Sequence, residues 1–187
     1  MDSKKISILV VFAALTVFLN ISPIKIPAPY APFLIYQLWE IPIVTVLVLY
    51  GFSMGIYVSI INTLILILIY PGALPTGPIY NFIAVVSMLL GIYIIKKLSL
   101  NFIKIENEKI SIVVSTILGT IMRVITMTIV NWIVLPFPPP IGFSIPPDVV
   151  LTFLPLIGFF NATLTLYTIP FGEILAKAIK IRIIINQ

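Results

Sequence analysis

The sequence predicts an all-α integral membrane protein with six transmembrane helices and both termini in the cytoplasm. Of the 187 residues, 60% are hydrophobic and 9% are charged, whereas a soluble domain carries about a quarter of its residues as Asp, Glu, Lys or Arg. Charge-free runs, among them residues 41–95, are long enough to hold spans of roughly 20 apolar residues each. The basic residues gather on one side of the predicted helices, which is the usual signal of orientation in a membrane.

The first predicted helix is the apolar run Ile6–Ile21, which follows Lys4 and Lys5. No small-x-small cleavage site follows this run, so we interpret it as a retained span and not as a signal peptide. The next stretch, Pro23–Pro32, holds four prolines and therefore predicts a stiff loop.

The middle of the chain predicts three more helices, separated by glycine and proline. The second, Trp39–Phe52, is about 20 Å long and is short for a bilayer of roughly 30 Å. The third is Ile56–Tyr70 and the fourth is Ile79–Ile95, with the turn-rich segment Pro71–Pro78 between them.

The last part of the chain predicts two long helices. A hydrophilic connection, 96–109, precedes the fifth helix Ile110–Leu135, and a third proline-rich loop, Pro136–Pro147, separates it from the sixth helix Val149–Ile179. The sixth helix contains two prolines, at either of which we expect a bend. No internal repeat or linker interrupts the sequence, so residues 1–187 are predicted to form one six-helix transmembrane domain.

The distribution of basic residues predicts the orientation. Six spans place nine Lys and Arg residues on the side of the termini and one, Lys25, on the other side. The termini are therefore expected in the cytoplasm, and the protein is expected to be a multi-pass protein of the cell membrane. The same distribution argues against nucleic acid as a partner, because these basic residues flank the spans.

The prolines show the opposite asymmetry. The three loops on the outer side hold 13 of the 16 prolines. Stiff apolar loops over a helical bundle would suit a pocket that is covered from outside. The alternative is that these prolines only terminate helices.

The residue inventory argues against catalysis. There is no Cys and no His, and the six acidic residues are scattered along the chain. These absences remove thiol nucleophiles, the usual neutral-pH base and the common transition-metal ligands. We therefore expect no enzyme activity, no metal site and no cofactor.

Arg123 lies near the middle of the fifth predicted helix, where a charge costs at least about 2.5–3.5 kcal/mol. It must face protein or water. We favour a structural role, in which Arg123 pairs with a carboxylate or with helix-end carbonyls, over contact with a substrate or partner. Glu173 is the one acid well inside a late span, but it should lie nearer the cytoplasm.

Four asparagines also fall within predicted spans: Asn62, Asn81, Asn131 and Asn161. Asparagine in a membrane commonly forms hydrogen bonds between helices. Asn131 and Asn161 are the better candidates for ligand contact, because both lie where a pocket open to the outside would reach. Phe33, Tyr36 and Glu40 cluster where the first loop enters the second helix; Glu40 there either caps the helix or accepts hydrogen bonds from a ligand.

Several short pieces of the chain resemble one family. They are Pro32-Phe33-Leu34 with Tyr36, Glu40-Ile41-Pro42, Gly72 to Pro78 with Ile79-Tyr80-Asn81-Phe82, Arg123-Val124-Ile125-Thr126-Met127 through Asn131-Trp132 to Pro136, and Pro155 with Phe160-Asn161. In order and spacing, over essentially the whole chain, they resemble the S component of energy-coupling factor vitamin transporters, and most of all its riboflavin-binding branch.

The resemblance implies a function. Such a subunit binds a vitamin tightly from the outside, docks on a membrane T subunit that carries two ATPase subunits, and catalyses nothing itself. By position, the resemblance implies ligand contacts for Asn131, Asn161, Phe33, Tyr36, Glu40 and Asn81. Riboflavin is the first expected ligand, and another vitamin such as thiamine or biotin is the alternative.

Two departures from the family pattern affect the details. The riboflavin branch usually has Phe-Asn-x-x-Lys in its sixth helix, and Leu164 stands here in place of the lysine. The first helix often carries Ala-x-x-x-Ala for docking on the T subunit, but Ala13 and Ala14 are followed four residues later by Val17 and Phe18.

The rival interpretation from another class is a structural subunit of a membrane complex, in which the asparagines bond to neighbouring helices and the proline-rich loops form contact surfaces.

Overall fold

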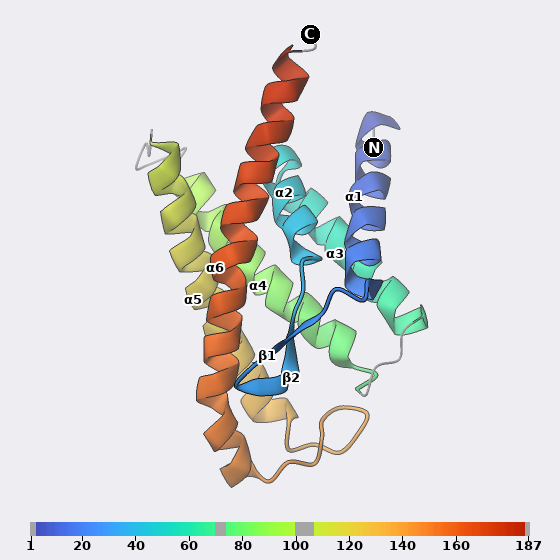
Figure 1. Cartoon of the computed structure of the whole chain (residues 1–187), viewed down its shortest axis with the longest axis vertical. Helices are drawn as coiled ribbons and strands as arrows, with labels where there is room; N and C mark the ends of the chain where they lie inside the picture. The colour runs from blue at the N-terminus through green and yellow to red at the C-terminus, as the bar shows by residue number, and fades with distance from the viewer. Residues whose placement is uncertain (1–2, 70–73, 100–106, 186–187) are drawn as a thin grey trace.

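The computed structural model describes residues 3–69, 74–99 and 107–185 and shows six helices and one short hairpin (Figure 1). In chain order the elements are α1 (Ser3–Ile21), β1 (Ile26–Ala28), β2 (Ala31–Tyr36), α2 (Glu40–Tyr50), α3 (Phe52–Ile69), α4 (Gly77–Leu98), α5 (Glu108–Val134) and α6 (Pro147–Ile185). Each helix overlaps the one that the sequence predicts. Both prolines of the sixth predicted helix, Pro155 and Pro170, lie inside α6.

Five of the helices in the described residues are long and apolar enough to cross a membrane. The exception is α2, whose 11 residues extend about 16 Å and so fall short of a hydrocarbon core of roughly 30 Å. It begins part-way along the bundle, where the chain rises from the hairpin (Figure 1). The predicted second span is therefore a short internal helix.

The position of α2 explains its sequence. It packs against α1, α3, α4 and α6, and Ile43, Val44 and Val46 are fully buried. A helix that is apolar on every side is stable where protein surrounds it on every side. Gly51 separates α2 from α3 with a φ of 94°, a conformation that glycine adopts without the steric cost of a Cβ.

The connection between α1 and α2 is a correction to the purely helical prediction, because it contains an antiparallel hairpin. Ile26 pairs with Tyr36 and Pro27 pairs with Ile35. Proline lacks the N–H that a central strand needs, but it is tolerated in an edge strand. Since the sheet has only two strands, both are edges, and a proline-rich segment can form them.

A close helix crossing joins α4 to α5 at two glycines. A Cβ added to Gly91 would lie 2.7 Å from the Cα of Gly119 and 2.8 Å from its backbone nitrogen. Small residues allow helices in membranes to approach closely and gain van der Waals contact. This contact fixes α5, which carries Arg123, against α4.

The start of α1 and the end of α6 lie at one end of the bundle, and the hairpin and the α5–α6 connection lie at the other (Figure 1). Lys5, Lys96 and Lys177 belong to the helix turns near the end that holds the termini, as the predicted distribution of basic residues requires, whereas Lys104 of that distribution lies outside the described residues.

The orientation can be tested by labelling single cysteines, since the chain has none of its own. Ile141 lies in the α5–α6 connection with 46% of its surface exposed, and Lys109 is exposed near the start of α5. In intact cells, a membrane-impermeant thiol reagent should label Ile141→Cys and spare Lys109→Cys until the cells are opened. The reverse pattern would invert the orientation.

Candidate ligand-binding cavity

A cavity of about 580 Å³ lies between α4, α5 and α6 at the end of the bundle that holds the hairpin. Strand β2 and the α5–α6 connection complete its wall. Its lining consists of Leu34, Leu74, Gly77, Tyr80, Asn81, Ala84, Arg123, Met127, Asn131, Leu135, Phe143, Ile145, Phe153, Ile157, Phe160 and Asn161. Cavities of this size and mostly apolar character are typical of small-molecule sites.

Helical periodicity brings these residues together. On α5, Arg123, Met127 and Asn131 recur every four residues, and on α6, Ile157 and Asn161 have the same spacing. Residues four apart lie on one face of a helix, one turn above the other. Each helix therefore presents one ladder of side chains to the cavity.

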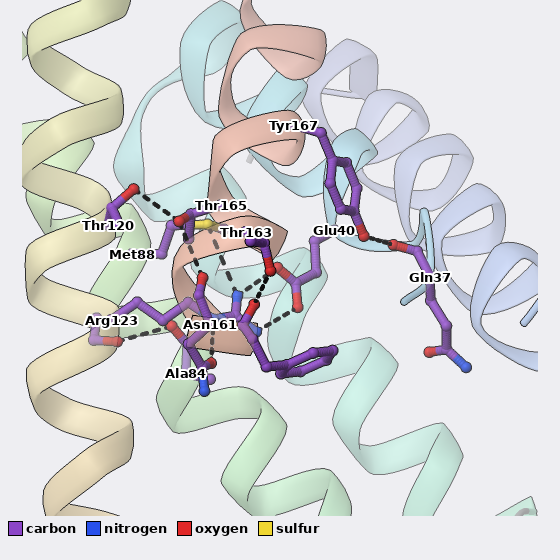
Figure 2. Close-up of polar contacts among 12 residues, drawn as sticks. Gln37, Glu40, Ala84, Met88, Thr120, Arg123, Asn161, Thr163, Thr165 and Tyr167 are labelled. Carbon is purple, nitrogen blue, oxygen red and sulfur yellow. Dashed lines mark hydrogen bonds and ion pairs between the residues drawn. The ribbon is translucent and has the colours of Figure 1, made fainter. Parts of the chain in front are cut away.

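Arg123, which lines the cavity, forms a buried ion pair with Glu40 behind it (Figure 2). Arg123 on α5 and Glu40 at the start of α2 are only 3% and 2% exposed. Both guanidinium Nη atoms bind the carboxylate, with Nη2 donating to Oε1 of Glu40 at 2.9 Å. The Nε atom donates to Oδ1 of Asn161 at 2.8 Å, so one side chain joins α2, α5 and α6.

The partner of Arg123 is therefore Glu40, and Glu173 has a different partner. Glu173 lies toward the other end of the bundle, where the Nζ atom of Lys96 is 2.8 and 3.0 Å from its two oxygens. A buried charge without a partner is strongly destabilising, which explains why each of these two acids meets a base.

The two leading asparagines both line the cavity, but they are held differently. The amide nitrogen of Asn161 donates to the carbonyl of Ile157 and its oxygen accepts from Arg123. The amide nitrogen of Asn131 donates to the carbonyl of Met127 at 2.7 Å, and within the described part of the chain its Oδ1 has no hydrogen-bond partner. The Oδ1 atom of Asn131 can therefore accept a hydrogen bond from a ligand without breaking an existing one.

Of the other predicted ligand contacts, some line the cavity and others do not. Asn81 on α4 lines the cavity. Glu40 and Tyr36 do not belong to the lining of the described cavity; Glu40 lies behind Arg123. Phe33 lies in β2, and its side chain falls outside the described residues.

Tyr36 contacts Phe160, which in turn lines the cavity. Its ring lies 4.9 Å from the ring of Phe160, centroid to centroid, and its hydroxyl is 2.6 Å from the hydroxyl of Thr163 on α6. Tyr30, in the turn of the hairpin, is hydrogen-bonded to Tyr36 and packs edge-on against Phe159. Burial raises the pKa of Tyr30, with a further contribution from its hydrogen bond to Tyr36. The hairpin is thereby fixed to α6.

Beside the cavity, two hydrogen bonds join the start of α4 to the α5–α6 connection. The hydroxyl of Thr76 donates to the carbonyl of Pro140 at 2.6 Å, and the hydroxyl of Tyr80 donates to the carbonyl of Ile141 at 2.8 Å. The connection carries Phe143 and Ile145, which line the cavity. We refer to these two hydrogen bonds as the loop tie.

Tyr80 and Phe160 lie in segments that resemble the family, but Phe143 and Phe153 of the aromatic lining were not singled out from the sequence. Tyr80, Phe143, Phe153 and Phe160 all line the cavity. The sequence could have indicated Phe153 and Phe160, because both are three or four residues from Ile157, which lies one turn before Asn161 on the same side of α6. Phe143 lies in a loop, and no periodicity indicates its direction.

The two alanines proposed for docking face different ways. Ala13 is 5% exposed and packs in the core of the bundle, whereas Ala14 is exposed. The exposed face of α1 also holds Val10, Val11 and Phe18. Of the predicted pair, Ala14 alone is accessible to a partner.

Comparison with solved structures reveals a close likeness over nearly the whole chain. The chain is similar to a structure described as the S component of a bacterial ECF transporter, with a TM-score of 0.73 and 25% sequence identity, covering 96% of this chain and 99% of that one. No family model and no curated protein sequence matches the chain. The structural likeness supports the S component family and a multi-pass membrane protein.

Proposed function

We propose that this protein is the substrate-binding S component of an energy-coupling factor importer. The observation that carries the proposal is the cavity of about 580 Å³, lined by three asparagines and several aromatic rings, in a bundle that resembles an S component over 96% of the chain. A subunit of this kind binds and hands over its substrate, so its role is transport and not catalysis.

We further propose riboflavin as the ligand. Its planar ring system needs flat apolar surfaces, which Phe143, Phe153 and Phe160 supply, and its ring edge needs hydrogen-bonding groups, which the amides supply. Leu164 is buried and does not belong to the cavity lining. The lysine of the family pattern thus has no substitute at that position, and the remaining amides carry more of the recognition.

Transport requires partners that this chain does not contain. The proposed partners are a membrane T subunit and two ATPase subunits, with ATP hydrolysis on the cytoplasmic side driving release of the ligand. The exposed apolar face of α1, including Ala14, is a candidate for T-subunit contact. With the termini in the cytoplasm, the cavity end of the bundle faces outward and the protein imports its ligand across the cell membrane.

A structural subunit remains the rival function, and the asparagines separate the two. A scaffold needs Asn131 and Asn161 bonded to neighbouring helices, whereas a binding subunit needs them in one cavity. Both line the same cavity. Asn161 does accept a hydrogen bond from Arg123 on α5, as a scaffold requires, but Asn131 makes its described hydrogen bond within its own helix. This arrangement favours the binding function.

Asn131→Ala should weaken riboflavin binding roughly five- to 150-fold, because a buried polar group of the ligand loses a hydrogen bond worth about 1–3 kcal/mol. Titration of detergent-purified protein, followed by flavin fluorescence, measures the effect. Asn62→Ala is the matched control, since Asn62 is a buried asparagine that pairs with Asn20 between α3 and α1. It should leave the affinity unchanged.

The purified parent protein gives a direct test of the ligand. A co-purified flavin has a yellow absorbance spectrum and would identify itself. Unchanged riboflavin affinity in Asn131→Ala and Asn161→Ala would place the site elsewhere, and uptake of thiamine or biotin in preference to riboflavin would keep the family and reject the riboflavin branch.

A further inference from the structure

The cavity wall carries one formal charge, and that charge is already neutralised. Among the described residues that line the cavity, Arg123 is the single charged side chain. Glu40 holds it from behind through both carboxylate oxygens, and neither side chain has appreciable contact with solvent. A ligand in the cavity therefore meets a neutral pair.

The donors of Arg123 can be followed one by one. A guanidinium group has five N–H bonds. The Nε–H bond goes to Asn161, one bond from each Nη goes to Glu40, and the second bond of Nη1 faces the sulfur of Met88 at 3.9 Å. One N–H of Nη2 is left, for which the described residues supply no acceptor. A single N–H suits a neutral carbonyl oxygen, whereas a bound carboxylate or phosphate is usually held by two parallel donors.

Charged ligands are disfavoured at this site for physical reasons. An anion beside Arg123 would also lie beside the Glu40 carboxylate, and in a site of low dielectric this repulsion is weakly screened. A cation would lie beside Arg123 and would find no carboxylate in the described lining. In either case the ligand would lose its hydration without gaining a counter-ion.

We propose that the cavity selects an uncharged ligand, and that Glu40 sets this selectivity by neutralising Arg123 without touching the ligand itself. The inference rests on the proposed binding function and narrows its substrate class. Among the vitamins considered above, it favours uncharged riboflavin over cationic thiamine and anionic biotin. Glu40 is thus a positioning and charge-setting residue, and not a direct contact as the sequence resemblance implies.

The test compares neutral and anionic flavins of matched shape. One pair is riboflavin and its 5′-phosphate; the other is 10-methylflavin and 10-(carboxymethyl)flavin, which places the charge near the ring. Dissociation constants are measured for the parent, Glu40→Gln and the double variant Glu40→Gln/Arg123→Gln. Glu173→Gln is the matched control, because it removes a buried paired acid at the other end of the bundle.

The parent should bind the neutral member of each pair at least tenfold more tightly. In Glu40→Gln, the anionic-to-neutral ratio of dissociation constants should fall at least tenfold for one pair or both, and the change should weaken as salt is added. The double variant should return to the parent ratio, and Glu173→Gln should keep it. A simple loss of structure would weaken both members of a pair equally.

Two results would overturn the inference: equal binding of an anionic flavin and its neutral partner by the parent, or an unchanged ratio in Glu40→Gln. If Glu40→Gln cannot be purified, the anionic-to-neutral ratios of the parent and the double variant are compared. A parent ratio near one, or a double variant whose ratio differs from that of the parent, then overturns the inference. A vitamin panel separates this inference from the proposed function. Tightest binding of thiamine or biotin rejects charge selection and riboflavin but keeps the binding function, tightest binding of another uncharged vitamin rejects riboflavin alone, and no binding rejects both proposals.

Discussion

Arg123→Met, with Glu40 retained, is expected to lower the free energy of unfolding by about 3–5 kcal/mol. The substitution leaves the Glu40 carboxylate buried without a counter-ion, and removal of one partner from a buried pair has this cost. It also removes the Nε donor from Asn161 and so breaks one of the side-chain hydrogen bonds between α5 and α6, while the Thr120–Thr165 hydrogen bond remains. Thermal unfolding of the detergent-purified protein measures the loss as a lower midpoint.

Two further variants show whether the buried charge is the cause. Glu40→Leu/Arg123→Met removes both charges and should recover most of the stability, since neutral side chains of similar volume can replace a buried pair at little cost. Lys177→Met breaks the ion pair between Lys177 and Glu108, in which both side chains are more than half exposed. It should lower the free energy of unfolding by less than about 1 kcal/mol. If Arg123→Met unfolds no more easily than Lys177→Met, the pair is not a structural element.

Gly91→Leu is expected to cost at least about 1–3 kcal/mol of stability and to separate α4 from α5. Its side chain would have to occupy space held by the backbone of Gly119 and the carbonyl oxygen of Leu118, each within 2.8 Å of the new Cβ. Backbone atoms cannot move aside as a side-chain end can, so the helices must part. The unfolding midpoint and the riboflavin affinity should fall together, because α5 carries Arg123, Met127 and Asn131.

The glycines of the chain supply graded controls for this prediction. At Gly119, an added Cβ would meet the end of the Ile169 side chain at 2.7 Å, which can rotate away, so Gly119→Ala should be milder than Gly91→Ala. At Gly77, nothing lies within 4 Å, and Gly77→Ala should be neutral. Equal effects at Gly91 and Gly77 would show that the close helix crossing is unimportant.

The helices could be predicted from the sequence because hydrophobicity alone defines a membrane span. The charge-free runs indicated their positions, and the prolines indicated the connections. The sequence already predicted a short second helix, but the hairpin and the enclosure of α2 by other helices could not be predicted in the same way. Both depend on protein surrounding the polypeptide, since a backbone at membrane depth must satisfy its polar groups internally.

The candidate site was predictable in part for a similar reason. Asn81, Asn131 and Asn161 stand out because amides are rare in apolar helices, and all three line the cavity. The pairing of Arg123 with Glu40 was hidden, because the residues are 83 positions apart and the sequence does not state which helices are neighbours. Phe143 was hidden too, because only the folded loop directs it inward.

The loop tie has a kinetic consequence. The hydroxyls of Thr76 and Tyr80 hold the α5–α6 connection by two neutral hydrogen bonds. If each bond is worth about 1 kcal/mol, both are broken at the same time in roughly 3% of the molecules, and the connection is then released from α4. A ligand that enters or leaves here must wait for that opening in both directions. The tie therefore slows association and dissociation by the same factor and lengthens the residence time of the ligand without altering its affinity.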